Sequence, residues 1–215
     1  MCFAIAVHYN QGFIDALACC DELPRAALQR SCAMMIRMHM VSGIILLIVF
    51  TVFLSIIFWS VKNGIGPSPS GWKPMDAILQ AIPEGESGII YELGSGWGQL
   101  AVAIARRFPQ SKVIGVENSP APFFVSLLLC WARRVPNVKI RFRNLFQQPL
   151  GDASGVVCYL YPGAMKRLRP ILEAQLAPGA WVVSSTFAIP GWTPSNQIAV
   201  DDLYRTTIFV YRVDS

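Results

Sequence analysis

The sequence has few charged residues and few metal-binding side chains. Only 14% of its 215 residues are charged and 53% are hydrophobic, whereas about a quarter of an ordinary globular chain is charged. There are two histidines, and none of the six cysteines forms a Cys-x-x-Cys pair, so we expect neither a metal site nor a disulfide scaffold. The apolar content, with 11% aromatic residues, also excludes a disordered chain. A chain this apolar is built either for lipid or for unusually deep burial.

The net charge of +5 is unevenly distributed along the chain. Residues 1–60 are neutral overall, and much of the excess after them comes from one cluster: Arg133, Arg134, Lys139, Arg141 and Arg143. This cluster fits a solvated face around a helix-to-strand turn, and it also fits a surface that meets anionic lipid or an acidic partner. No recognised nucleic-acid-binding motif accompanies it, so we expect no nucleic acid as a partner.

One long uncharged run predicts a membrane span. No charged residue occurs from Met40 to Val61, and a helix of ~20 apolar residues crosses the ~30 Å hydrocarbon core of a bilayer. Trp59 stands at the end of the run, where interfacial aromatic residues are common. The rival interpretation, a cleaved signal peptide, requires an apolar region of about 7–15 residues and a small-residue cleavage site. We therefore expect one transmembrane helix over 40–61, with the bilayer as a partner, after a segment 1–39 of uncertain structure.

A stretch rich in glycine, proline and serine follows the span, and we interpret residues 62–73 as a linker. From there on, strand and helix patterns alternate. The expected strands are 88–93, 112–117, 138–142, 156–160 and 180–187, the expected helices are 75–82, 99–108, 120–135 and 164–176, and residues 197–200 and 203–213 form a closing hairpin. This alternation predicts an α/β domain over 74–215, with a mostly parallel sheet covered on both faces and an antiparallel pair at its C-terminal edge.

The most specific motif joins the first strand of this domain to a helix. Glu92 stands near the end of the strand, and Gly94, Gly96 and Gly98 follow directly before the helix. Glycines serve where the backbone takes a positive φ or lies against a ligand, and this first turn of a doubly wound sheet is where nucleotides bind. The dinucleotide pattern Gly-x-Gly-x-x-Gly is not met, because position 99 holds neither glycine nor alanine. A tightly packed turn without a ligand is the alternative.

The glycine spacing, with the acid before it, resembles the cofactor loop of class I methyltransferases that use S-adenosyl-L-methionine. The resemblance implies a Rossmann-like sheet of seven strands, the last one antiparallel, and that cofactor. Glu92 suits the amine of the methionine end of this ligand, and free N–H groups of the loop suit its carboxylate. Glu117, which ends the second strand, is expected to accept both ribose hydroxyls, unless it is a capping or surface residue. Asn144 is expected to accept from the adenine amine beside the apolar Leu145, unless it is a turn residue.

The resemblance narrows to the membrane-anchored protein-lysine methyltransferases of the mitochondrial type, which act on the ATP synthase c-subunit and on the adenine nucleotide translocase. It covers roughly residues 40–213. It rests on the span before the domain and on four stretches: Glu92–Gly98, Gly115–Asn118, Leu160–Pro162 and the aromatic-x-x-Pro-x-Trp-x-Pro stretch at Phe187–Pro194. These stretches add Ser95 and Asn118 to the expected cofactor site. The family has Asp-Gly where this chain has Trp97-Gly98, and Asp-Leu-Trp where it has Asn144-Leu145-Phe146; these departures leave the methyl acceptor open.

The resemblance implies methyl transfer to lysine in a protein in or near the membrane. Such a transfer depends mainly on positioning, and desolvation lowers the pKa of the amine, so we expect no dedicated base. Tyr161, Pro162 and Trp192 are expected to line the acceptor channel, although Trp192 is alternatively a packed loop residue. A small-molecule or lipid methyltransferase and a catalytically silent cofactor-binding module are the alternative functions. The domain is expected to face the cytoplasm, or the matrix in a mitochondrion, although the charges flanking the span favour the opposite side by one residue.

Overall fold

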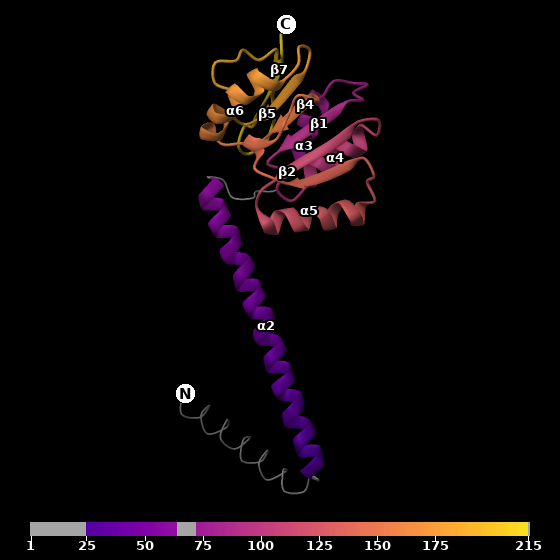
Figure 1. Cartoon of the computed structure of the whole chain (residues 1–215), viewed down its shortest axis with the longest axis vertical. Coiled ribbons are helices and arrows are strands. Elements are labelled where there is room, and N and C mark those ends of the chain that lie inside the picture. Colours follow the sequence, from indigo (N-terminus) through magenta and orange to yellow (C-terminus); the bar gives the residue numbers. More distant parts are fainter. Residues whose placement is uncertain (1–24, 64–71, 215) are drawn as a thin grey trace. The chain divides into compact units, whose positions relative to one another are not determined.

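The computed structural model describes residues 25–63 and 72–214 (Figure 1). Residues 1–24 and 64–71 lie outside the described residues, and with them most of the predicted N-terminal segment and most of the predicted linker. The chain divides into two units, Met1–Val52 and Phe53–Ser215.

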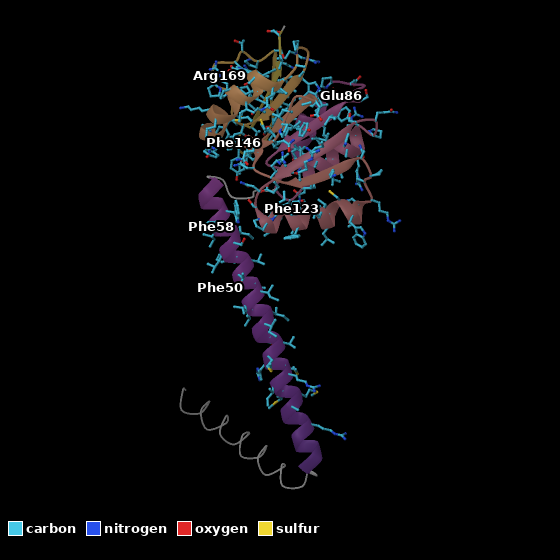
Figure 2. All side chains as sticks on the ribbon, viewed as in Figure 1. Phe50, Phe58, Glu86, Phe123, Phe146 and Arg169 are labelled. Carbon is cyan, nitrogen blue, oxygen red and sulfur yellow. The ribbon has the colours of Figure 1, made fainter. Side chains whose placement is uncertain are left out.

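Helix α2 (Arg25–Asn63) contains the whole of the predicted span. Within Ala33–Trp59, the most apolar 18-residue stretch has a mean hydropathy of 2.9, and 0% of it is buried. Phe50 and Phe58 are among its exposed side chains (Figure 2). The helix begins at Arg25 instead of Met40 because residues with high helix propensity, mainly alanine, leucine, arginine and methionine, fill the stretch before the span. An apolar helix of this length near the N-terminus is typical of a membrane anchor and also of a signal sequence.

The second unit is built on a seven-stranded sheet with the order β3-β2-β1-β4-β5-β7-β6. Its strands are β1 (Ile89–Leu93), β2 (Lys112–Glu117), β3 (Val138–Phe142), β4 (Ala153–Cys158), β5 (Trp181–Ser185), β6 (Asn196–Ala199) and β7 (Thr207–Arg212). The pairs among β1 to β5 are parallel, and β7 lies antiparallel to both β5 and β6. The predicted Rossmann-like sheet, with its last strand antiparallel, is confirmed.

Two strands begin three or four residues away from their predicted starts. β4 begins at Ala153, before the expected start, because Ala153 pairs with Ile89 and the Ser154 hydroxyl donates to the carbonyl of Ile89 at 3.0 Å. β7 begins only at Thr207 because the turn before it is held by Asp202. That carboxylate accepts the backbone N–H of Thr206 at 2.8 Å and its hydroxyl at 2.7 Å. Local side-chain bonds of this kind compete with strand pairing.

Helices cover both faces of the sheet. They are α3 (Trp72–Ala81), α4 (Gln99–Arg107), α5 (Pro120–Arg133) and α6 (Pro162–Gln175), and a short 3-10 helix, η1 (Leu145–Gln147), follows β3. One apolar cluster lies under α3 and α4, and a second lies under α6. Successive residues of a strand point to opposite faces, so Ile90 joins the first cluster whereas Tyr91 and Leu93 join the second. Both faces are therefore buried, which explains why the central strands are continuous apolar runs.

Candidate cofactor and acceptor site

The glycine turn lies at the carboxyl end of β1, between β2 and β4. Gly94, Gly96 and Gly98 have φ values of +81°, +54° and +79°, a region that side chains other than glycine rarely adopt. A Cβ at Gly98 would lie 2.7 Å from the Cβ of Ser126, so this glycine lets α4 begin against α5. A Cβ at Gly96 would meet nothing within 4 Å. Gly96 is therefore the position of the turn that opens onto free space.

Backbone hydrogen bonds attach this turn to β2. The N–H groups of Gly94 and Ser95 both donate to the carbonyl of Val116, at 2.9 and 3.0 Å. The N–H of Gly98 donates to the carbonyl of Ser95 at 2.9 Å, and the N–H of Gly96 donates to the Glu117 carboxylate at 2.8 Å. Three of these N–H groups therefore donate to backbone carbonyls. The N–H of Gly96 differs from the other three, because its acceptor is a side chain predicted to bind the ligand.

Glu92 is buried under the turn, with 4% of its surface exposed. Its Oε2 accepts the hydroxyl of Ser95 at 2.5 Å, and it also accepts the backbone N–H of Ala101. Burial, reinforced by repulsion from Glu117, raises the pKa of Glu92 to about 8 despite these hydrogen bonds. The side chain is therefore largely protonated at neutral pH, and in this structure its contacts organise the turn. Its contact with a cofactor amine stays a prediction.

Glu117 ends β2, as predicted, and only 7% of its surface is exposed. Its Oε1 accepts the backbone N–H groups of Asn118 and Ser119 at 2.9 and 2.7 Å, while its Oε2 faces Gly96. Ser119 is the N-cap residue of α5, but its side chain makes no capping bond. The carboxylate is thus held rigidly beside the turn. A carboxylate has about four acceptor positions, so an acceptor position remains for a ribose hydroxyl beside these three bonds.

Asn144 and Leu145 lie just after β3, at the same edge of the sheet. The side-chain oxygen of Asn144 caps η1 by accepting the N–H of Phe146 at 3.1 Å. Leu145 and Phe146 are half-buried against the cluster under α6, and the Arg167 guanidinium lies 4.0 Å from the centre of the Phe146 ring. The contacts of Asn144 in this structure are therefore those of a turn residue. A hydrogen bond from Asn144 to adenine stays a prediction.

The residues predicted to line the methyl-acceptor channel lie at two separate positions along α6. Tyr161 is the N-cap of α6 and Pro162 is its first residue, at the carboxyl edge of the sheet. Trp192 instead donates its Nε1–H to Glu173, at 2.9 Å, and packs edge-on against Tyr211 with ring centres 5.7 Å apart. Because a helix rises ~1.5 Å per residue, Glu173 lies roughly 18 Å along the axis from Tyr161. The structure therefore does not bring Trp192 together with Tyr161 and Pro162.

The loop that carries Trp192 is fastened to α6 by charged side chains. Arg169 donates from Nε to Glu173 at 2.7 Å and from Nη1 to the carbonyl of Pro190 at 3.0 Å. The hydrogen bond from Trp192, followed by that from Arg169, lowers the pKa of Glu173. These contacts match the interpretation of Trp192 as a packed loop residue.

Sequence reasoning missed a strained residue at the end of β5. Thr186 has a φ of +69°, which is a genuine outlier for a β-branched residue. Its N–H donates to the carbonyl of Thr207 at 2.8 Å, and the hydroxyl of Ser184 donates to the carbonyl of Phe187 at 2.5 Å. β5 lies beside β4, so Thr186 stands near the expected acceptor side of the edge. No motif spacing signals it, because its conformation depends on pairing with the distant β7.

Metal-binding groups and reactive thiols are not part of this site. Within residues 25–63 and 72–214, no three histidine, cysteine, aspartate or glutamate side chains gather to hold a metal ion. Cys158 is free, and burial raises the pKa of its thiol to about 12, so it stays protonated.

Known proteins resemble this chain over the whole of the site. A family model described as the ANTKMT methyltransferase domain matches residues 92–196. The chain is 30% identical, over 145 residues, to a protein-lysine N-methyltransferase of Saccharolobus islandicus, covering 66% of this chain and 90% of that protein. It is 32% identical, over 123 residues, to the adenine nucleotide translocase lysine N-methyltransferase of Mus musculus, covering 57% of this chain and 53% of that protein.

A solved structure agrees with these relatives. The RNA methyltransferase from Salinibacter ruber in complex with S-adenosyl-L-homocysteine is 29% identical, with a TM-score of 0.64, and the match covers 69% of this chain and 95% of that one. The cofactor is therefore S-adenosyl-L-methionine, as the resemblance of the glycine turn to class I methyltransferases implies. The site suits it, because the open space at Gly96 lies beside a carboxylate that is fixed but not saturated.

Proposed function

We propose that this chain, which belongs to the family of S-adenosylmethionine-dependent protein-lysine methyltransferases, methylates a lysine of a protein held in or next to a membrane. Membership of the family supports lysine as the acceptor. The single observation that carries the membrane setting is α2, because its segment Ala33–Trp59 is long and apolar enough to span a bilayer.

The chain's own residues divide the work between cofactor and acceptor. Glu117 holds the ribose, and Gly96 allows the cofactor to approach the backbone of the turn closely. The hydrogen bond between Glu92 and Ser95 stabilises the conformation of the turn. Asn118, Asn144 and Leu145 complete the cofactor side. When bound, the cofactor supplies a methyl group on a sulfonium, which is a good leaving group. Catalysis then rests mainly on holding the two reactants in line.

The acceptor enters at the start of α6 in this proposal. Tyr161 and Pro162 stand at the carboxyl edge, where the methyl group is presented. The lysine amine must arrive neutral, and an apolar, water-poor approach lowers its pKa. Were the cofactor bound, it would supply the methyl group of its sulfonium to this neutral amine, and the extra proton on nitrogen would leave to solvent. No side chain is needed as a base for this step.

We place the transmembrane helix at 40–61, the linker at 62–73 and the catalytic domain at 74–215, facing the cytoplasm or the mitochondrial matrix. S-adenosylmethionine is made and kept inside, so a domain on the outer side would lack its donor. The charge bias around the span opposes this orientation by only one residue. Protease added to sealed right-side-out vesicles is expected to leave the domain intact, and its digestion would rule out this orientation.

Labelled cofactor tests the function directly. Membranes from cells with the chain, without it, and with Glu117→Ala receive cofactor with a labelled methyl group, and proteins and lipids are then separated. We expect one labelled membrane protein that depends on the intact chain, with the label on lysine by peptide mass spectrometry. Label in the lipid extract would favour a lipid methyltransferase, and cofactor binding without any label would favour a silent module. Either result would refute the proposal.

A further inference from the structure

Helix α5 leaves a broad apolar face uncovered in the described structure. Phe124, Leu128 and Trp131 recur at a spacing of four and three residues, which places them on one stripe of the helix. Their exposed fractions are 67%, 62% and 78%. The opposite side of α5 packs on the sheet, where Ser126 is fully buried and Phe123 contacts Phe142 with ring centres 5.1 Å apart. The side chains of this apolar stripe therefore do not contribute to the core of the domain.

The other sheet-covering helices do not share this feature. Within the described residues, α4 and α6 contribute no exposed large apolar side chain and α3 contributes one, Trp72, whereas α5 contributes five: Phe124, Val125, Leu127, Leu128 and Trp131. Scattered single exposed apolar residues are normal, but a contiguous patch marks an interaction site. The α5 patch, defined by these five residues, is such a site.

In the stretch of sequence that carries the α5 patch, every charged residue is basic. From residue 118 to residue 151 the sequence contains no aspartate or glutamate. Arg133 and Arg134 are exposed at the C-terminal end of α5, and Arg106, from α4, donates to the carbonyl of Arg133 at 3.3 Å and adds a third exposed cation there. Aromatic and aliphatic residues with a basic border are typical of helices that lie in the headgroup region of anionic membranes.

The covalent chain keeps such a surface close to the membrane that α2 enters. The described part of α2 ends at Asn63 and α3 begins at Trp72. The residues between them reach roughly 30 Å when fully extended, at ~3.3–3.6 Å per residue. If α2 spans a bilayer, the domain therefore stays within about its own diameter of the surface, so the local concentration of lipid is always high.

We propose that the α5 patch and its basic border bind the anionic headgroup region of the membrane and dock the catalytic domain on it. This inference rests on the proposed membrane anchoring by α2. Pro120 begins α5 three residues after Glu117, so docking holds the cofactor edge of the sheet at the level of the membrane surface. Lysines close to the bilayer then become the preferred acceptors, without any change in the cofactor site.

Crosslinking in the full chain tests this docking. A photo-crosslinking amino acid is placed at Leu128, and at Leu203 as the matched control, because Leu203 is equally apolar and 89% exposed but lies in the turn between β6 and β7. The chains are reconstituted in vesicles of phosphatidylcholine, with or without phosphatidylglycerol. We expect lipid adducts at position 128 that increase with the anionic lipid, and few at position 203. Equal lipid adducts at the two positions, or no response to the anionic lipid, would overturn the docking.

Three further readouts separate the possible failures. The same two chains are illuminated in cell membranes, where a protein adduct at position 128 in place of lipid would mean that the patch binds a protein and would overturn the inference. Extraction with alkaline carbonate reports on α2 independently, because release of the chain would refute the anchoring and the docking together. A Phe124→Glu, Trp131→Glu double variant is expected to lose the lipid adducts at position 128 while keeping its cofactor affinity, which shows that the domain is folded. Retained adducts in that variant would also overturn the inference.

Discussion

At the ends of β1 and β2 the loops are held by backbone hydrogen bonds, whereas near α6 the loop after β5 is held by side chains. Gly94 and Ser95 donate to the carbonyl of Val116, and three backbone N–H groups orient Glu117. In contrast, Arg169 and Glu173 fasten the loop that carries Trp192. Backbone bonds do not depend on the identity of the side chains, so we expect the half around Gly94–Gly98 and Glu117, the cofactor half, to keep its shape under most substitutions. The half around α6 and the loop after β5, the acceptor half, depends on particular side chains.

The largest expected effect concerns Glu92, the buried carboxyl of the cofactor half whose pKa is raised. Because the pKa of Glu92 is raised from 4.5 to about 8, folding favours its protonated form. Its contribution to stability is fully present below pH 4.5 and is lost as the pH rises to about 8. Glu92→Gln keeps a neutral side chain, so we expect this variant to lose that slope and to gain several kcal/mol relative to the wild type above pH 8.

Urea unfolding of residues 62–215 at pH 5, 7 and 9 measures this effect. The matched control is Glu173→Gln in the acceptor half, where the carboxyl is exposed and its pKa is lowered. We expect the control to keep the pH slope of the wild type. A wild-type domain whose stability does not fall between pH 5 and 8 would show that Glu92 is charged in the folded state.

The second prediction removes the central contact of the cofactor half. Glu117→Ala deletes the acceptor proposed for the ribose hydroxyls and releases the N–H of Gly96. A hydrogen bond to a charged group contributes about 1.5–3 kcal/mol, so we expect cofactor affinity to fall roughly 10- to 100-fold. Calorimetry on the folded variant measures this, with Glu173→Gln again as the control. Unchanged affinity for Glu117→Ala would remove Glu117 from the site.

The third prediction separates two glycines of the same turn. Both Gly96→Ala and Gly98→Ala place a side chain at positive φ, at a cost of about 1 kcal/mol each. Only Gly98→Ala also forces a Cβ to within 2.7 Å of Ser126, so we expect it to lose about 1–3 kcal/mol more. Gly96→Ala instead puts a methyl group into the open space and weakens cofactor binding. Equal losses of unfolding free energy in the two variants would mean that α5 moves and relieves the clash with Ser126.

The alternation of strands and helices and the glycine turn after β1 were predicted from the sequence because each depends on local chemistry. Glycines at positive φ, an acid at the end of a strand and alternating apolar patterns leave few other interpretations. The strain at Thr186 and the partners of Trp192 did not follow, since they depend on which distant segments pack together. The α5 patch was not foreseen for a related reason. An apolar helix pattern shows that a face is buried somewhere, but not whether protein or lipid buries it.

The smallest expected effect is at Trp192, and it decides how far the acceptor site extends along α6. Trp192→Phe removes the hydrogen bond to Glu173 but keeps an aromatic ring against Tyr211. Glu173 remains paired with Arg169 and solvated, so we expect a loss of at most about 1 kcal/mol in unfolding free energy. Cofactor affinity and the KM for the methylated protein should stay unchanged, because the contacts of Trp192 lie far along α6 from Pro162. Tyr161→Ala, by comparison, is expected to raise that KM. If Trp192→Phe raises the KM as much as Tyr161→Ala does, the acceptor channel includes the loop after β5, and the side-chain network around Glu173 shapes it.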